Sequence, residues 1–504
     1  MADTVLAGLP DGGKVTATGC DVAVIGGGAA GLHVCLEAAE QGAGVTLISR
    51  KPLVESASFR AQGGLAAAIS PDDSPARHAA DTYDAGRGLC DPGAVSTLVA
   101  AAPAAVRQLV ERGVNFDRDP DGELALGLEG GHSARRIVHA NGAETGRELT
   151  SRLASLVAAH ERISVLEGAS AQALWADGSA CWGVVTDAGR IRAGATVLAT
   201  GGGAALWERT TNPWGAIGAG AVLAQAAGAD LADLELCQFH PTALAMPGSE
   251  LDGWLLTEAV RGEGAVLLDA AGRRFTDELA PRDQVTAAIL DRMAVDGGAS
   301  VALDLSPVDL DRYPAIVAHL REVGIDAARE PVPVAPAAHY LIGGVRTDLE
   351  GHTSVRRLFA VGECACTGLH GANRLASNSL SECFVFGSRA ARAAASSGPD
   401  PGAAPNPPSW RFEPPTAETR RAVWELAGPI REASGLERLT ADPYPLARAI
   451  ATSALAREES RGAHRRSDRP ERDPRLDGVH VILDHEGRTR LDRWRDRTPA
   501  DAVD

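Results

Sequence analysis

A glycine motif between two apolar runs near the start of the chain restricts the fold more than any other feature. Residues 21–50 read DVAVIGGGAAGLHVCLEAAEQGAGVTLISR. An apolar run of strand length precedes Gly26, Gly28 and Gly31, and an alanine-rich run and a second apolar run follow them. This pattern predicts a strand, a tight turn, a helix and a second strand, as in a doubly wound α/β domain. The glycines would let a pyrophosphate approach the helix N-terminus, although a glycine-rich turn in an empty α/β fold is the alternative.

The residues after the second strand indicate which dinucleotide would bind. The strand ends at Ser49 and Arg50, without the acidic residue that binds the adenosine ribose in NAD enzymes. Two later runs, ATVLATGGGA at 195–204 and RRLFAVGECA at 356–365, also end in glycine and are expected to return to the same sheet. Glu363 in the second run could bind ribityl hydroxyls. The sequence therefore favours FAD over NAD.

Length and composition predict several domains. The chain has 504 residues, 45% of them hydrophobic, which is enough for two or three packed cores. The expected fold class is α/β: a Rossmann-like FAD-binding domain with an inserted α+β capping domain and a short C-terminal helical domain. The boundaries we expect are 1–233 and 341–397 for the FAD-binding domain, 234–340 for the capping domain, 398–410 for a Pro-rich linker, and 411–504 for the helical domain and a charged tail.

Charge and cysteine spacing exclude several classes of partner. The net charge of −17 disfavours a nucleic-acid partner, because the average surface would repel phosphates. The eight cysteines have no metal or iron-sulfur spacing, so we expect free thiols and no metal site. We see no signal peptide and no uninterrupted apolar run of membrane-spanning length, and we therefore expect a cytoplasmic protein without membrane contact.

Four basic residues lie in apolar or glycine-rich surroundings instead of on polar faces. They are His240 in CQFHPTAL, Arg282 in LAPRDQV, His339 in PAAHYLIGG and Arg374 in GLHGANRL. Taken singly, each would more often be a core histidine or an arginine in an ion pair between domains. Taken together they predict a clamp for a small dicarboxylate, because each carboxylate favours a bidentate arginine or paired histidine donors in a dry site.

Three further segments are candidates for the same site. Thr257 and Glu258 in LLTEAVRGEG could add hydrogen bonds, although a helix-capping pair is the alternative. Residues 56–68, SASFRAQGGLAAA, suit a backbone wrapped around a flat ring, and a helix beginning near Ser379 would direct its N-terminal dipole toward that ring. In LEGGHSARRIVHA, Glu129 is either a solvated partner of its basic neighbours or a substrate ligand.

The combination of RAQGG, EGGHSARRI, QFHPTAL, LLTEAVRGEG, LAPRD, PAAHY and GLHGANRLASNSL resembles the succinate dehydrogenase/fumarate reductase flavoprotein superfamily, and within it the L-aspartate oxidases. The resemblance runs from about Asp21 to Ala394, and a related stretch, ALAREESRGAHRRSDRPERD, lies near the end. It implies FAD-dependent oxidation of L-aspartate to iminoaspartate by hydride transfer from Cα to flavin N5, the first step of de novo NAD biosynthesis. It also implies oxygen or fumarate as the electron acceptor and leaves open a handover of product to quinolinate synthase.

The resemblance assigns roles residue by residue. The implied FAD contacts are Gly26, Gly27, Gly28, Ala29, Ala30, Gly31, Arg50, Ala57, Ser58, Phe59, Arg60, Ala61, Gln62, Gly63, Gly64, Glu363, Ser379 and Leu380. The implied substrate contacts are Glu129, His240, Thr257, Glu258, His339, Arg374 and Ser377, with Arg282 as the proton-transfer residue or a group that polarises the substrate. Ala57 stands where succinate dehydrogenases carry the histidine that bonds flavin covalently, so we expect noncovalent FAD.

Glu129 takes a sharper role within this resemblance. Succinate and aspartate differ by one ammonium group, and a buried carboxylate is the natural counterion for that group. We therefore predict that Glu129 distinguishes aspartate from succinate.

The sequence departs from the family pattern at two places, which affect the expected FAD affinity and the expected closure of the capping domain. Ala219 in AIGAGAV replaces an aspartate that usually helps to hold the cofactor, so FAD affinity should be weaker unless another group substitutes. The loop from Phe275 to Arg282 is shorter than usual, which affects how the capping domain closes. Two alternatives remain at this stage: a soluble fumarate reductase, and a flavin-binding or pathway protein that has lost activity.

Overall fold

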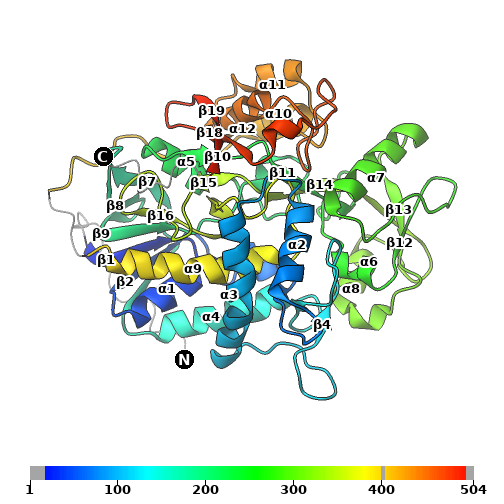
Figure 1. The fold of residues 1–504 in the computed structure, drawn as a ribbon, viewed down its shortest axis with the longest axis horizontal. Helices are drawn as coiled ribbons and strands as arrows, with labels where there is room; N and C mark the ends of the chain where they lie inside the picture. The colour runs from blue at the N-terminus through cyan, green and yellow to red at the C-terminus, as the bar shows by residue number, and fades with distance from the viewer. Residues whose placement is uncertain (1–17, 399–402, 495–504) are drawn as a thin grey trace.

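The glycine motif joins a strand to a helix in a seven-stranded sheet (Figure 1). The computed structural model describes residues 18–398 and 403–494. The central strand β1 (Thr18–Ile25) is parallel to both of its neighbours, β2 (Val45–Ser49) and β9 (Gly189–Leu198). Beyond them, β6 (Ile163–Glu167) pairs with β2 and β16 (Leu358–Ala360) pairs with β9, both in parallel. The expected return of a later strand to this sheet is thus observed.

An antiparallel meander extends the sheet on one side. It consists of β7 (Ala171–Ala176), β8 (Cys181–Thr186) and the first half of β9. A short three-stranded sheet elsewhere holds residues 57–64, the flavin-type loop, named for the flavin ring that it is expected to contact. It contains β3 (Leu65–Ala66), β5 (Ile137–Val138) and β4 (Leu126–Gly127).

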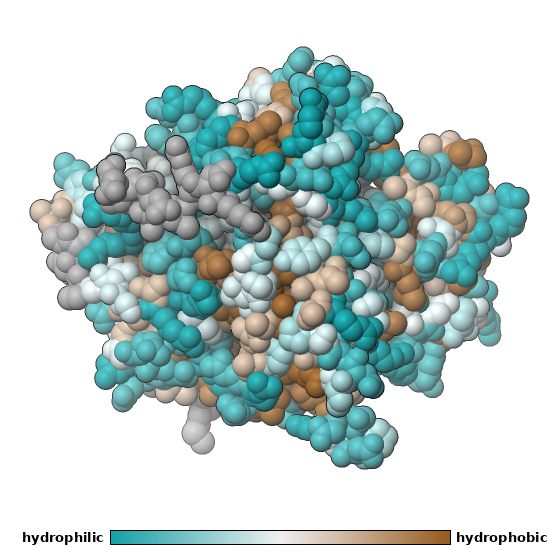
Figure 2. All heavy atoms as spheres, viewed as in Figure 1, coloured by the Kyte–Doolittle hydropathy of each residue, from teal (hydrophilic) through white to brown (hydrophobic). Residues whose placement is uncertain are grey.

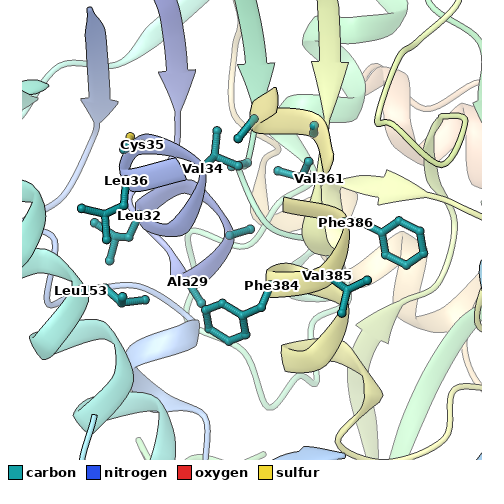
Figure 3. Close-up of a cluster of buried hydrophobic side chains, with 14 of the residues drawn as sticks. Ala29, Leu32, Val34, Cys35, Leu36, Leu153, Val361, Phe384, Val385 and Phe386 are labelled. Carbon is teal, nitrogen blue, oxygen red and sulfur yellow. The ribbon is translucent and has the colours of Figure 1, made fainter. Parts of the chain in front are cut away.

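Residues of β1 alternate between two hydrophobic cores, as the period of a buried strand requires. Val22 and Val24 belong to the first core and Ala23 and Ile25 to the second. The first core is covered by four helices: α1 (Ala29–Glu40), α3 (Pro92–Glu111), α4 (Thr145–Ala159) and α9 (Asn378–Ser396). Figure 3 shows Leu32 of α1, Leu153 of α4 and Phe384 of α9 in this core. The second core contains α5 (Ala219–Ala226) and helices of the C-terminal region.

Two glycines of the motif are required by close contacts. Gly26 has a φ of +116°, a value that side chains disfavour. A Cβ atom on Gly31 would lie 1.9 Å from the carbonyl oxygen of Gly26, so α1 packs on the turn only if residue 31 is glycine. These contacts explain the first and third positions of the motif.

Helix α3 is, in the described part of the chain, the one helix long and apolar enough to cross a membrane. Its apolar side chains, among them Leu98 and Val106, belong to the first core and pack with α9. The apolar composition of α3 is therefore explained by its place in the core. The face shown in Figure 2 is mostly hydrophilic, with hydrophobic residues in small patches.

The segment expected to cap the site forms a separate sheet and core (Figure 1, green). Its four strands have the order β11 (Cys237–Leu244), β14 (Val332–Leu341), β13 (Val301–Asp304) and β12 (Val266–Leu268). Its helices are α6 (Glu258–Gly262), α7 (Arg282–Asp296) and α8 (Pro314–Glu322). The long strands β11 and β14 belong to two cores: Cys237 and Leu341 lie in the second core, and Leu244 and Val334 lie in the core of the capping region.

The C-terminal region contains helices and a hairpin. The helices are α10 (Ala417–Leu426), α11 (Ala433–Leu439) and α12 (Pro445–Ala456). The hairpin, β18 (Val479–Leu483) and β19 (Thr489–Arg493), was not predicted; it completes a sheet with β17 (Ala365–Cys366), β15 (Gly344–Arg346) and β10 (Leu231–Ala232). The remaining elements are α2 (Pro75–Ala85) and five single 3₁₀ turns: η1 (Ser58–Arg60), η2 (Ala204–Leu206), η3 (Leu310–Arg312), η4 (Gly362–Cys364) and η5 (Pro474–Leu476).

The charged segment after α12 is partly buried. Arg457 and Glu459 are fully buried, and Arg457 forms ion pairs with Glu459 (Nη1–Oε1 3.1 Å) and Glu235 (Nε–Oε1 2.6 Å). Opposite charges therefore let this polar segment pack against residues 233–235, just before β11. Residues 495–504 and part of the Pro-rich linker, 399–402, lie outside the described residues; 403–410 form neither helix nor strand.

Candidate active site

One cavity of about 580 Å³ extends from the glycine motif to the capping region. Nearly all the residues that we predicted to contact FAD or substrate line this cavity. Those lining it are Gly26, Gly27, Gly28, Ala29, Ala30, Arg50, Ala57, Ser58, Arg60, Ala61, Gln62, Gly63, Gly64, Glu129, His240, Thr257, Glu258, Arg282, His339, Glu363, Arg374, Ser377, Ser379 and Leu380. Two do not line it: Gly31 packs against the Gly26 carbonyl, and the Phe59 ring lies 5.5 Å from the guanidinium of Arg147.

The end of the cavity near α1 suits a dinucleotide. Gly28 precedes α1, whose first backbone N–H groups can therefore face an anion. Ser58 Oγ accepts a hydrogen bond from the Ala29 N–H (3.1 Å), which fixes the loop of residues 57–64 against this helix N-terminus. A Cβ atom on Gly64 would lie 2.3 Å from the Val138 carbonyl, so this loop can follow the small sheet only with glycine at that position.

Two buried polar side chains in the cavity fit the polar groups of a flavin nucleotide. Gln62 Oε1 is buried without a hydrogen-bond partner in the described chain. Glu363 accepts a hydrogen bond from the Leu341 N–H (3.1 Å), and burial raises its pKa to about 7. Ribityl hydroxyls and flavin N–H groups are donors that would satisfy such acceptors. The residues present therefore fit FAD.

The opposite end of the cavity carries two neutral histidines on adjacent strands. His240 lies on β11 and His339 on β14, and their ring centroids are 5.0 Å apart. Burial and the nearby Arg282 lower the pKa of both rings well below its usual value. Thr211 Oγ1 fixes His339 at Nδ1 (2.8 Å), whereas His240 Nε2 has no hydrogen-bond partner within residues 18–398 and 403–494. That nitrogen can bind a substrate oxygen.

Two arginines donate hydrogen bonds to the same glutamine, which the sequence analysis did not predict as a site residue. Gln238 Oε1 accepts hydrogen bonds from Arg282 Nη1 (3.0 Å) and Arg374 Nη2 (3.1 Å). Burial and the charge of Arg282 lower the pKa of Arg374 to about 10, so this guanidinium remains charged near neutral pH. Gln238 lies two residues before His240 on β11, and the strand period of two could have identified it.

Glu258 links Arg282 to a second arginine that sequence reasoning also missed. Its carboxylate lies 2.6 Å from Arg282 Nε and 3.3 Å from Arg261 Nη2. Burial opposes the charged form, but Arg282 and Arg261 outweigh burial and lower the pKa of Glu258. The neighbouring Thr257 caps α6, because its side chain accepts from the Ala259 N–H (3.4 Å). Glu258 thus acts as the ionised centre of a buried row of charges.

Glu129 lies between the flavin-type loop and the substrate end. It is buried and accepts a hydrogen bond from Ser377 Oγ (2.6 Å). Of its four basic neighbours, His139 lies near it (Nε2–Oε1 3.8 Å), whereas Arg136 pairs with Asp73 and Asp81. The other two neighbours are also placed elsewhere, because His132 binds the carbonyl of Ala376 and Arg135 is exposed. The structure therefore places Glu129 in the cavity instead of in solvent.

Comparisons with known proteins identify the family of the chain. A family model described as an FAD binding domain matches residues 21–380, and one described as fumarate reductase flavoprotein C-term matches residues 434–498. The L-aspartate oxidase of Mesorhizobium japonicum is 46% identical over 477 residues, which cover 89% of this chain and 92% of that protein. The chain belongs to the L-aspartate oxidase family.

The L-aspartate oxidase family and the wider superfamily account for nearly the whole chain. The L-aspartate oxidase of a Nostoc species is 46% identical over 450 residues, covering 82% of this chain and 77% of that protein. Among solved structures, E. coli quinol fumarate reductase FrdA has a TM-score of 0.86 at 30% identity, covering 97% of this chain and 99% of that chain. FAD is therefore the cofactor of the cavity, and the absence of a histidine at Ala57 agrees with noncovalent binding.

Proposed function

We propose that the protein oxidises L-aspartate to iminoaspartate with bound FAD, as the first step of de novo NAD biosynthesis. One observation carries the proposal: Glu129, two neutral histidines and two arginines line the same cavity as the dinucleotide-binding turn. This set matches the charges of aspartate, which has two carboxylates and one ammonium group. Its relatives of 46% identity are L-aspartate oxidases.

The arginines and histidines would orient the substrate. Arg374 is the charged donor suited to one carboxylate, and His240 and His339 can donate to oxygens of the dicarboxylate from the floor of the cavity. Gln238 fixes the guanidiniums of Arg282 and Arg374 through a single oxygen. Holding both carboxylates in this way fixes Cα relative to the cofactor and removes much of the entropy cost of the reaction. Bound FAD supplies the hydride acceptor.

Glu129 would bind the ammonium group of aspartate. The carboxylate has one hydrogen bond, from Ser377, and its other oxygen faces a histidine 3.8 Å away, so it retains acceptor capacity. Arg282 is placed to polarise the substrate or move its proton, with Glu258 holding Nε of its guanidinium at 2.6 Å. Each of these roles is assigned to a residue that already lines the cavity.

The decisive experiment is anaerobic mixing of the FAD-loaded protein with L-aspartate. We expect bleaching of the flavin absorbance with L-aspartate and little or none with D-aspartate or succinate. Subsequent addition of oxygen or fumarate should restore the absorbance, which identifies the acceptor. Failure of L-aspartate to bleach flavin in a loaded protein would reject the proposed activity.

A soluble fumarate reductase is the second candidate, favoured by the structural likeness to quinol fumarate reductase FrdA. The same clamp would then bind fumarate, and reduced flavin would deliver electrons to it. The comparison of turnover with L-aspartate and with fumarate in one preparation separates the two functions. We further propose a cytoplasmic location. We also propose that iminoaspartate is handed over to quinolinate synthase, because this product is a reactive imine. Co-purification of the two proteins would test the handover.

A further inference from the structure

An exposed tryptophan lines the nucleotide end of the cavity. It lies close in sequence to Ala219, which stands where the family pattern has an aspartate. The side chain of Trp214 belongs to a residue that is 61% exposed, yet it is part of the cavity wall. Ala219, five residues later, begins α5 and lines the same cavity without a polar side chain. The segment from Trp214 to Ala219 therefore lacks the carboxylate of the family pattern but carries an aromatic side chain at the cavity.

The position of the Trp214 loop identifies which half of the dinucleotide it would meet. Arg50 directly follows β2 and donates from Nη2 to the carbonyl of Gly215 (3.1 Å). In dinucleotide-binding folds, the residue at the end of the second strand contacts the adenosine ribose. The start of the same loop contacts the histidine clamp, because Thr211 Oγ1 lies 2.8 Å from His339 Nδ1. The loop therefore runs from the histidines to Arg50, and Trp214, next to Gly215, lies at the Arg50 end, where the adenosine half would bind.

The C-terminal region holds this loop in place. Arg420 Nη2 donates to the Trp214 carbonyl (3.3 Å), and the Tyr444 hydroxyl donates to the Ile217 carbonyl (2.8 Å). Together with Arg50, these donors fix the backbone from Trp214 to Ile217. An exposed side chain on a fixed backbone is suited to contact a ligand without a large ordering cost.

The indole ring has one face covered and much of its surface open. The guanidinium of Arg420 lies 4.8 Å from the ring centroid, in a cation–π contact. Phe412 lines the same cavity, and its backbone N–H donates to the carbonyl of Gln172 (2.8 Å), next to the cavity residue Ala171. The nucleotide end thus presents two aromatic side chains and Arg50 to the cavity, and a purine base is the part of a flavin dinucleotide that such a wall fits.

We propose that Trp214 stacks on the adenine of FAD, with Arg420 on the opposite face of the indole, and that this contact takes over the binding role of the missing aspartate. The inference rests on the proposed use of FAD. It adds a residue to the nucleotide site that the family pattern does not assign. The contact contributes to cofactor affinity and leaves the chemistry at the other end of the cavity unchanged.

The test uses the flavin-free full-length protein titrated with FAD, with ADP and with FMN. ADP contains the adenosine half of the cofactor, and FMN lacks it. Replacing Trp214 by alanine should weaken FAD and ADP binding about 10- to 100-fold, the usual loss for one base–aromatic stack, and leave FMN binding unchanged. ADP should also quench part of the tryptophan fluorescence of the wild-type protein, and that part should vanish in Trp214→Ala.

Two variants control for unfolding and for nonspecific effects. Trp214→Phe keeps an aromatic face and should retain most of the ADP affinity. Trp410→Ala removes another exposed tryptophan, 39% exposed and absent from the cavity wall, and should change neither affinity nor the ADP-dependent quenching. Equal weakening by Trp410→Ala, or unchanged ADP binding in Trp214→Ala, would overturn the inference.

The same titrations separate this inference from the proposed function. If aspartate fails to bleach the flavin but Trp214→Ala still loses ADP affinity, the proposed activity fails and the adenine contact stands. If aspartate bleaches the flavin and Trp214→Ala binds ADP as the wild type does, the adenine contact fails alone. A wild-type protein that binds neither FAD nor ADP would refute both.

Discussion

The hydroxyl of Ser377 donates a hydrogen bond of 2.6 Å to Glu129 Oε2 and accepts one of 3.2 Å from the backbone N–H of Gly64. Ser377 has a φ of +60°, a left-handed conformation that costs a residue with a side chain about 1 kcal/mol or more. This backbone is what brings the hydroxyl between the flavin-type loop and the carboxylate. The position of Glu129 is therefore tied to the position of the loop of residues 57–64.

Replacing Glu129 by glutamine should impair aspartate oxidation and spare fumarate reduction. Loss of a charge-assisted hydrogen bond costs about 1.5–3 kcal/mol, so kcat/KM for L-aspartate should fall roughly 10- to 100-fold. Fumarate has no ammonium group, and its reduction should stay within about threefold of wild type, since only uniform effects remain. Glu123→Gln, an exposed position before the same loop, serves as the control. Equal losses for both substrates would return Glu129 to a structural role.

Replacing Glu258 by glutamine should slow turnover, because Arg282 loses the carboxylate that holds its guanidinium. The substitution keeps the shape of the side chain but removes the charge between Arg282 and Arg261, whose guanidiniums lie 2.6 Å and 3.3 Å from it. We expect kcat to fall roughly 10- to 100-fold, the range for one charged hydrogen bond, with a smaller change in KM. Steady-state kinetics with L-aspartate measure both. Glu263→Gln, at the end of the same helix but part-exposed, should leave kcat unchanged; a similar loss there would point to a general effect on the capping region.

FAD binding should become tighter as the pH rises through 7. Burial raises the pKa of Glu363 to about 7 in the empty site. Hydroxyl donors of the cofactor favour the ionised carboxylate and lower that pKa, so binding releases a proton below pH 7 and affinity is lost as the pH falls. The dissociation constant should drop about tenfold between pH 6 and 8. Titrations of flavin-free protein measure this dependence, and Glu363→Gln should abolish it; proton uptake on binding would contradict the assignment.

Breaking the buried ion pairs of Arg457 should destabilise the whole protein. Arg457→Met leaves Glu235 and Glu459 buried without their shared partner, and such losses cost about 3–5 kcal/mol. We expect a lower midpoint in denaturant unfolding and weaker docking of the C-terminal region, seen as easier proteolysis after α12. Arg475→Met removes an arginine whose side chain is 88% exposed and should leave the midpoint unchanged. Equal midpoints in the two variants would show that the buried network does not stabilise the fold.

The first strand, turn and helix were predictable because their signal is local. The alternation of β1 and the contacts of Gly26 and Gly31 arise within 14 residues of sequence. Four cavity residues were identified because their chemistry is unusual for their surroundings, and most of the others only through the family resemblance. His240 and Arg374 are examples, since a basic residue among apolar ones requires a partner or a function.

The contacts that the sequence did not predict depend on segments far apart in the chain. Gln238 is an ordinary amide until the fold brings Arg374 to it from 136 residues away. The buried position of Arg457 after α12 could not be read from the sequence, because its partner Glu235 lies 222 residues earlier. In the hairpin, β18 reads VHVIL and has no acidic residue, lysine or arginine, but the turn DHEGR and β19, which reads TRLDR, are charged, and these charges hid the strand pattern. Composition alone reports none of these pairings.

The strands that cross from one core to the other also join the two regions that border the cavity. β11 and β14 lie in the second core at Cys237 and Leu341 and reach Leu244 and Val334 in the core of the capping region. His240 lies on β11 beside an irregularity in the register of the pair. Arg282 begins α7 of the capping region, and its Nη1 donates to Gln238 on β11 (3.0 Å). One continuous strand therefore carries both a cavity histidine and the acceptor that the capping helix contacts, so the two regions share a hydrogen bond inside the molecule.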